Sequence, residues 1–129
     1  MSVQTESTPD IAREINRSRA RVISYLMKLS KCVAANHADL AQAVSQRFNE
    51  VLIDYVSYVH FRFLECCAPE AHQLAALERI TQQAVAFSEK YCLTEDMPLK
   101  ALQRDLEDLA YALEVRFEIE DEIACAQAA

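Results

Sequence analysis

Ionisable side chains interrupt two apolar helical patterns of this sequence, and they are its candidates for chemistry. In residues 99–123, positions spaced alternately by three and four are Leu or Ile, except for Arg116 and Glu120. In residues 52–65, His60 lies on the mainly apolar side of the predicted helix. Because burying a lone charge costs several kcal/mol, these residues must neutralise one another or serve a site.

A metal centre is the first alternative, because helical bundles can bind metals through carboxylates and Glu-x-x-His pairs. The sequence has three histidines and no Glu-x-x-His pair, and two of the histidines fall near predicted helix ends. A mixed site would have to use His60 with Glu65, Glu114 and Glu120. Because this ligand set is small, we expect no metal and no cofactor.

Covalent chemistry fits the residue types less well. The reactive histidine of a phosphotransfer bundle is exposed, with a basic residue at +3 and a small one at +4, whereas Phe63 and Leu64 follow His60. A nucleophilic thiol needs a base beside it, but Cys66 and Cys67 lie a turn or more beyond His60. We therefore expect a protein that is not an enzyme.

A neutral polar layer inside the fold is the interpretation that we favour. Arg116 and Glu120 are one helical turn apart and can pair along the same helix. The ring of His60 can donate an N–H to Glu120 or to a neighbouring carboxylate.

The elements that must position these residues are helices, because the chain has no glycine for tight hairpin turns or phosphate-binding loops. Thr8-Pro9-Asp10 is typical of a helix start. A break is predicted at residues 36–39, since Asn36 tolerates the left-handed conformation. One continuous helix over residues 10–67 is the alternative, although helices of that length are uncommon.

Further helices are predicted from about residue 38 to 67, from Pro69 to Tyr91, and from the 94–98 connection to about residue 126. Connections this short make neighbouring helices antiparallel. The predicted fold is all-α, an antiparallel up-down-up-down four-helix bundle. Residues 1–7 are expected to be a flexible N-terminus, and residues 8–129 a single helical-bundle domain.

The net charge and its distribution along the sequence restrict the class of partner that the protein can bind. The net charge of −7 argues against direct binding of nucleic acid. Residues 10–31 are mainly basic and residues 105–122 mainly acidic, so the first and last helices can offset each other, or the acidic side can take a basic ligand. Five cysteines without a CxxC pair, no signal-like segment and no long apolar run predict a cytoplasmic protein without a membrane span.

Two segments resemble a known family. Asp54-Tyr55-Val56-Ser57, His60-Phe61 and Glu65 resemble the second-helix motif of the Rsd/AlgQ family of anti-sigma factors, and residues 112–121 (ALEVRFEIED) resemble its last-helix motif. The resemblance implies a helical bundle that binds the C-terminal, promoter-reading domain of the primary sigma factor. The complex would keep this domain from core RNA polymerase and from the −35 promoter element.

The resemblance also implies roles for particular residues. Asp54 matches a surface acid on the sigma-contacting side, and the other expected partner-binding residues on that helix are Ser57, Tyr58 and Phe61. The expected buried polar network consists of His60, Glu65, Glu114, Arg116, Glu120 and Asp121.

The sequence also departs from the family pattern. It has no Trp, carries Val59 where a small residue precedes the motif histidine, and has Ala110-Tyr111 in place of a Gly-Glu pair. A helical adaptor with a different protein partner is therefore the alternative, and the oligomeric state is open.

Overall fold

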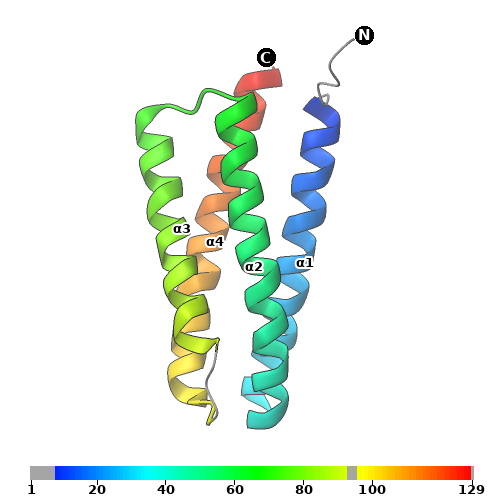
Figure 1. The fold of residues 1–129 in the computed structure, drawn as a ribbon, viewed down its shortest axis with the longest axis vertical. Helices are drawn as coiled ribbons and strands as arrows, with labels where there is room; N and C mark the ends of the chain where they lie inside the picture. Colours follow the sequence, from blue (N-terminus) through cyan, green and yellow to red (C-terminus); the bar gives the residue numbers. More distant parts are fainter. Residues whose placement is uncertain (1–7, 93–95, 129) are drawn as a thin grey trace.

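The computed structural model describes residues 8–92 and 96–128, which form four α-helices and no strand (Figure 1). The helices are α1 (Thr8–Ala34), α2 (Ala38–Cys66), α3 (Ala71–Tyr91) and α4 (Leu99–Ala128). The prediction of an all-α chain with four helices is confirmed. The predicted flexible segment 1–7 lies outside the described residues.

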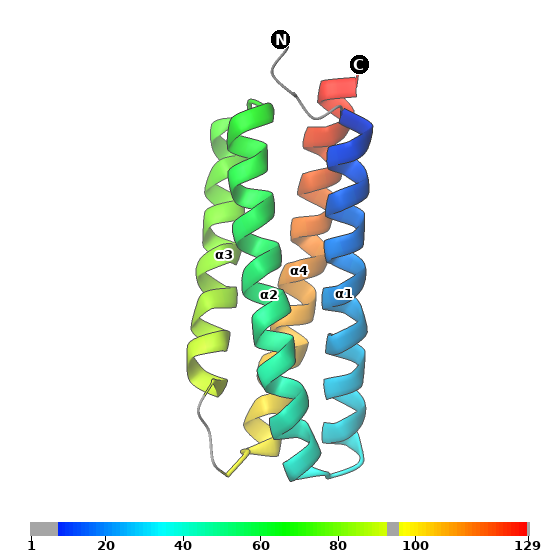
Figure 2. The ribbon, with the colours of Figure 1, turned by 45° about the vertical axis from the view of Figure 1, so that its right-hand side comes forward.

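The helices pack as a ring in which α1 touches α2 and α4, and α3 touches the same two helices. Figures 1 and 2 both show the start of α1 and the end of α4 at one end of the molecule, with each helix running opposite to the one before it. α2 and α4 therefore lie diagonally across the bundle. This placement separates the outer surface of α2 from that of α4.

The break between α1 and α2 depends on one residue in the left-handed region. Asn36 has a φ of 60°, a conformation that Asn adopts more readily than most residues other than Gly. Its backbone N–H donates to the carbonyl of Val33, and that of His37 donates to Cys32, both at 3.0 Å. These two bonds form a Schellman motif, which ends α1 and excludes one long helix.

The connection between α2 and α3 differs slightly from the prediction. α3 begins at Ala71 with Glu70 as its N-cap, so Pro69 precedes the helix instead of occupying its first position. Glu70 has an extended backbone, and its N–H donates to the side-chain oxygen of Gln73 at 2.9 Å. This bond satisfies the backbone N–H of the N-cap residue. Gln73, at the third helical position, thereby fixes the start of α3.

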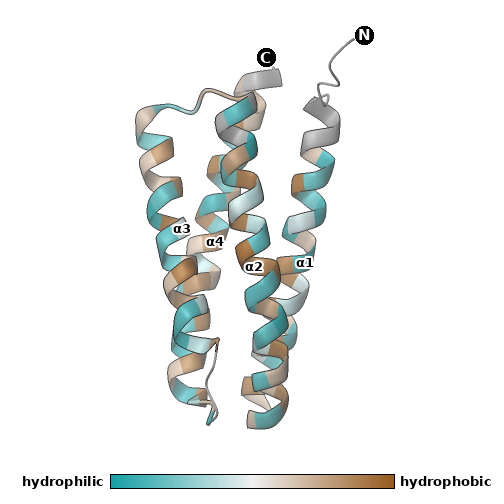
Figure 3. Ribbon diagram, in the orientation of Figure 1, coloured by the Kyte–Doolittle hydropathy of each residue, from teal (hydrophilic) through white to brown (hydrophobic). Residues whose placement is uncertain are grey.

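The core lies between the four helices and is mainly aliphatic, with a few aromatic rings. Figure 3 shows hydrophobic and hydrophilic positions alternating along every helix, as expected when one side of each helix is buried. Phe48 of α2 and Phe87 of α3 meet edge to face, with ring centroids 5.7 Å apart. No helix in the described part of the chain is long and apolar enough to cross a membrane.

A polar clamp joins the end of α3 to the start of α4. The carboxylate of Asp105 accepts hydrogen bonds from Lys90 Nζ at 2.8 Å and from Tyr91 Oη at 2.5 Å. The bonds from Lys90 and from Tyr91 hold the pKa of Asp105 below its ordinary value. Burial, followed by the bond to Asp105, raises the pKa of the Tyr91 hydroxyl, so the phenol stays a donor at neutral pH.

We expect Asp105→Asn to destabilise the fold by about 1 kcal/mol at neutral pH. Because the folded pKa of Asp105 is lower than its value of 3.8 in an unfolded chain, the stabilisation is present above that value and is lost as the pH falls through the folded pKa. Urea unfolding from neutral to acidic pH measures the difference. The control is Asp108→Asn, at an exposed position, and a difference that stays constant down to strongly acidic pH would contradict the assignment.

Candidate functional site

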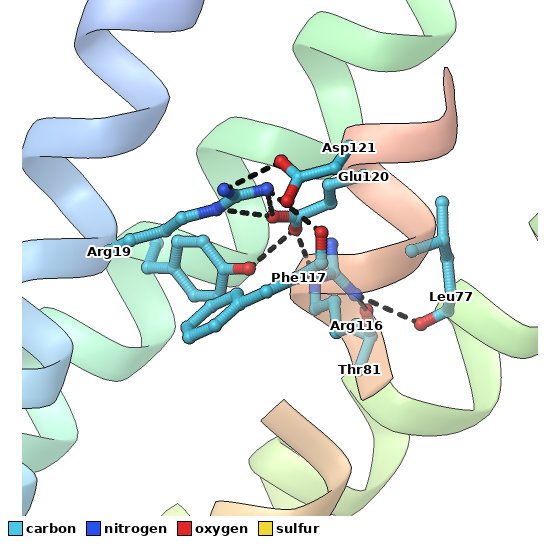
Figure 4. A network of polar contacts seen from close by, with 8 residues as sticks. Arg19, Leu77, Thr81, Arg116, Phe117, Glu120 and Asp121 are labelled. Atoms are coloured by element: carbon cyan, nitrogen blue, oxygen red, sulfur yellow. Dashed lines mark hydrogen bonds and ion pairs between the residues drawn. The ribbon is translucent and has the colours of Figure 1, made fainter. Parts of the chain in front are cut away.

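A buried ionic network crosses the bundle and is centred on Glu120 of α4. The Glu120 side chain is completely buried, yet both of its carboxylate oxygens are occupied by donors from the protein. These donors come from α1, α2 and α4, and a further contact extends the network to α3 (Figure 4). The network therefore joins all four helices.

Arg116 provides the link to α3. Its Nε donates to Glu120 Oε2 at 2.9 Å, one helical turn away on α4. Its Nη1 donates to the backbone carbonyl of Leu77 at 3.1 Å and to Thr81 Oγ1 at 2.8 Å. Arg116 is itself fully buried, and fixed partners of the fold accept bonds from its Nε and Nη1, whereas its Nη2 has no hydrogen-bond partner among the described residues.

Arg19 provides the link to α1. Its Nη2 lies 2.8 Å from Glu120 Oε1, and its Nη1 donates to Asp121 Oδ1 at 2.9 Å. The backbone carbonyl of Phe117 accepts a further bond at 3.2 Å. Burial alone would lower the pKa of Arg19, but the charge of Glu120 and the hydrogen bonds to Asp121 and Glu120 raise it overall. Arg19 therefore remains a cation inside the bundle.

Tyr55 provides the link to α2. Its hydroxyl donates to Glu120 Oε2 at 2.5 Å, and its ring lies under the guanidinium of Arg116 at 5.6 Å. Burial, followed by the negative charge of Glu120, raises the pKa of this phenol far above its ordinary value. The hydroxyl therefore stays protonated and acts only as a donor to the carboxylate.

The charges of this network balance, because two arginines face the carboxylates of Glu120 and Asp121. Four donor contacts saturate the two oxygens of Glu120, which leaves it no lone pair directed at a ligand. In residues 8–92 and 96–128, no group of three His, Cys, Asp or Glu side chains could hold a metal ion. The mixed metal site considered from the sequence is therefore not formed by these residues.

The comparison with protein families gives a match over nearly the whole chain. The family described as "Regulator of RNA polymerase sigma(70) subunit, Rsd/AlgQ" matches residues 3–126. The chain belongs to the Rsd/AlgQ family. Neither the comparison with curated proteins nor that with solved structures gives a match.

The residues expected to point inward from the Rsd/AlgQ motifs fall into two groups. Arg116 and Glu120 are fully buried and paired. Glu65, Glu114 and Asp121 are exposed, so the prediction that they are buried is wrong. Glu114 follows the buried Leu113 and Asp121 follows the buried Glu120, and this offset of one residue turns each toward solvent because successive helical positions rotate by about 100°. Asp121 nevertheless joins the network from its solvent side through Arg19.

His60 does not take the role predicted for it. It is half-buried, and its Nδ1 is buried without a hydrogen-bond partner among the described residues. Its ring instead packs edge to face on Phe61 at 5.9 Å. The neighbouring residue Val59 takes the inward position, and the donors to Glu120 are Tyr55 and the two arginines.

Three of the four expected partner-binding residues lie on the outer side of α2. Asp54, Ser57 and Phe61 are exposed, and Phe61 keeps 62% of its surface accessible. Tyr58 is half-buried, and its hydroxyl donates to the carboxylate of Glu14 on α1. Asp54 and Tyr58 also line a shallow groove of about 380 Å³, whose other walls include Arg17, Arg21 and Arg62.

Arg19 and Tyr55, which donate directly to Glu120, were missed in the sequence. Arg19 continues the buried series of α1, which alternates in steps of four and three and consists of Ile15, Arg19, Val22, Leu26, Leu29 and Val33. Tyr55 continues the corresponding series of α2, which consists of Phe48, Leu52, Tyr55 and Val59. The spacing that identified Arg116 and Glu120 would therefore have identified both.

Proposed function

We propose that this member of the Rsd/AlgQ family is an anti-sigma factor that binds the C-terminal, promoter-reading domain of the primary sigma factor through the outer side of α2. Binding would keep that domain from core RNA polymerase and from the −35 promoter element, in the cytoplasm and without catalysis. The family match supports a sigma-factor partner. The observation that carries the choice of surface is Phe61, a large aromatic side chain left 62% exposed on α2.

The outer side of α2 has the composition of a binding surface. Asp54, Ser57 and Phe61 are spaced by three and four residues, so their side chains share one side of the helix. Aromatic side chains are enriched among the residues that dominate binding energy. A carboxylate next to such an anchor can accept a charge-assisted bond from the Arg and Lys residues with which DNA-reading domains meet phosphates and bases.

The acidic surface of the protein lies elsewhere. The exposed carboxylates of α4 are Glu107, Asp108, Glu114, Glu118, Asp121 and Glu122. Because α4 is diagonal to α2, a small domain seated on α2 leaves most of them uncovered. Their contribution is therefore long-range attraction, which speeds encounter with a basic partner and weakens with added salt.

The immediate surroundings of Asp54 restrict the partner further. Arg17, Arg21 and Arg62 line the same groove as Asp54. A uniformly basic surface would be repelled there, so the partner must bring a cation to Asp54 and acidic or neutral groups to the arginines. The proposal thus requires a sigma surface of mixed charge.

A helical adaptor for another protein is the second candidate, and one observation favours it. Tyr111, which stands at a position where the sequence departs from the family pattern, is 71% exposed on α4. Another departure, Val59, is buried and is therefore not part of the α2 surface. A different partner would therefore dock on α4, and capture from a native lysate with or without Tyr111→Ala would distinguish the two surfaces.

Asp54→Ala is expected to weaken the complex with the purified C-terminal domain of the primary sigma factor by about 1–3 kcal/mol, because a charge-assisted hydrogen bond is lost. Isothermal titration calorimetry measures the change. The matched control is Glu118→Ala, an exposed acid on α4, which should change the affinity little. Absence of binding by the unaltered protein at low salt would reject the proposal.

A further inference from the structure

A second surface, distinct from the outer side of α2, lies between α1 and α4. It is a groove of about 390 Å³ whose floor and walls are mainly apolar and include Leu26, Met27, Val33, Leu106 and Ala110. Of this lining, Met27 is 55% exposed, and Ile23, one turn earlier on α1, is 41% exposed. Two large apolar side chains next to an apolar groove form a patch that association would remove from water.

We propose that this groove is the interface of a homodimer in which two copies meet along α1 and α4. The two-fold axis runs parallel to the helices, so α1 of each copy lies against α4 of the other. Interfaces of this kind are self-complementary, because each surface must match its own rotated image. The proposal concerns self-association and does not depend on the sigma factor.

The charges around the groove select a second copy as the occupant. Lys31 of α1 and Glu107 of α4 both line the groove, yet no ion pair joins them within the chain. The two-fold axis parallel to the helices brings Lys31 of one copy to Glu107 of the other, twice in each dimer. An axis across the helices would instead set α1 against α1 and bring like charges together.

The exposed charges of the two helices also differ in sign. Arg13, Arg17, Arg21, Lys28 and Lys31 are exposed on α1, and Glu107, Asp108, Glu114, Glu118, Asp121 and Glu122 are exposed on α4. Because Arg17 and Arg21 line the groove toward α2 and Asp108 lines a groove toward α3, the opposite charges at the proposed interface itself are those of Lys31 and Glu107. Complementary potentials of this kind favour one orientation over others.

The size of the surface is adequate for a stable dimer. α1 has 27 residues, which gives a length of about 40 Å at the usual helical rise. Two adjacent helices are roughly 20 Å wide, so the shared surface is on the order of 800 Å² for each copy, near the size of ordinary specific interfaces.

Sedimentation equilibrium of the full chain over a range of concentrations tests the proposal. The unaltered protein is expected to approach twice the chain mass of 14.6 kDa. Met27→Asp should weaken the dimer roughly tenfold or more, because it places a charge in the apolar contact. The control is Leu40→Asp on α2, where the replaced side chain is equally exposed at 54%, and it should leave the association unchanged.

A charge exchange tests the orientation. Lys31→Glu and Glu107→Lys should each weaken the dimer, because each places like charges opposite one another. The double variant Lys31→Glu/Glu107→Lys should restore it, because the exchanged charges meet again across the two-fold axis. A protein that stays monomeric at every concentration, or a double variant as weak as the two single changes combined, would overturn the proposal.

Discussion

Glu120→Gln is expected to lower the free energy of unfolding by about 3–5 kcal/mol, because it leaves buried cations without their counter-charge. Glu120 is the carboxylate that Arg19 and Arg116 share. The glutamine keeps the shape of the side chain but carries an NH2 group, which would face a donor on one side of the network. Folded domains are stable by about 5–15 kcal/mol, so this single change removes a large share of the total.

Urea unfolding followed by circular dichroism measures the loss, and two comparison variants test its cause. Glu118→Gln changes the same residue type two positions away on the exposed side of α4, and it should alter stability by no more than about 0.5 kcal/mol. Arg116→Met should cost less than Glu120→Gln, because Glu120 keeps Arg19 and Tyr55 as partners. Equal losses for Glu120→Gln and Glu118→Gln would show that burial of the ion pair does not control stability.

The helices and the centre of the network could be predicted because local rules and packing agree there. Asn36 can adopt the left-handed conformation, and the chain breaks where that property predicts. Arg116 and Glu120 continue a regular series of buried leucines, so their burial follows from the period of the helix. Arg19 obeys the same rule on α1, where it stands four residues after the buried Ile15 and three before the buried Val22.

The burial of the other candidate residues could not be predicted from the sequence. Helical spacing shows which side of a helix is apolar, but it does not show how wide the buried part of that side is. His60 adjoins Val59, and Glu114 adjoins Leu113, and in each case it is the apolar neighbour that is fully buried. Neighbouring residues of a helix point about 100° apart. The rotation of the whole helix about its axis, which depends on how the four helices pack, decides which of the two faces the core. The position of the acidic residues in space could not be predicted either, because net charge alone does not reveal that the acids of α4 lie diagonally from Asp54.

That diagonal placement makes Phe61→Ala a sharp test of the docking surface. We expect it to weaken binding of the sigma-factor C-terminal domain by about 2 kcal/mol or more, roughly thirtyfold, as for an aromatic residue at the centre of an interface. Stability should change by less than about 0.5 kcal/mol, since the Phe61 side chain is 62% exposed and lies outside the core. Calorimetry and urea unfolding on the same samples separate the two effects.

Tyr111→Ala is the matched control, because Tyr111 is a comparably exposed aromatic residue at 71% and lies on the opposite helix. If the partner docks on α2, this variant binds like the unaltered protein while Phe61→Ala does not. If the acidic side of the bundle is the docking surface, the order is reversed, because Tyr111 lies on α4 one turn from the exposed acids Asp108 and Glu114. Equal losses for both variants would contradict docking on α2, since one small domain cannot cover two outer surfaces that face away from each other.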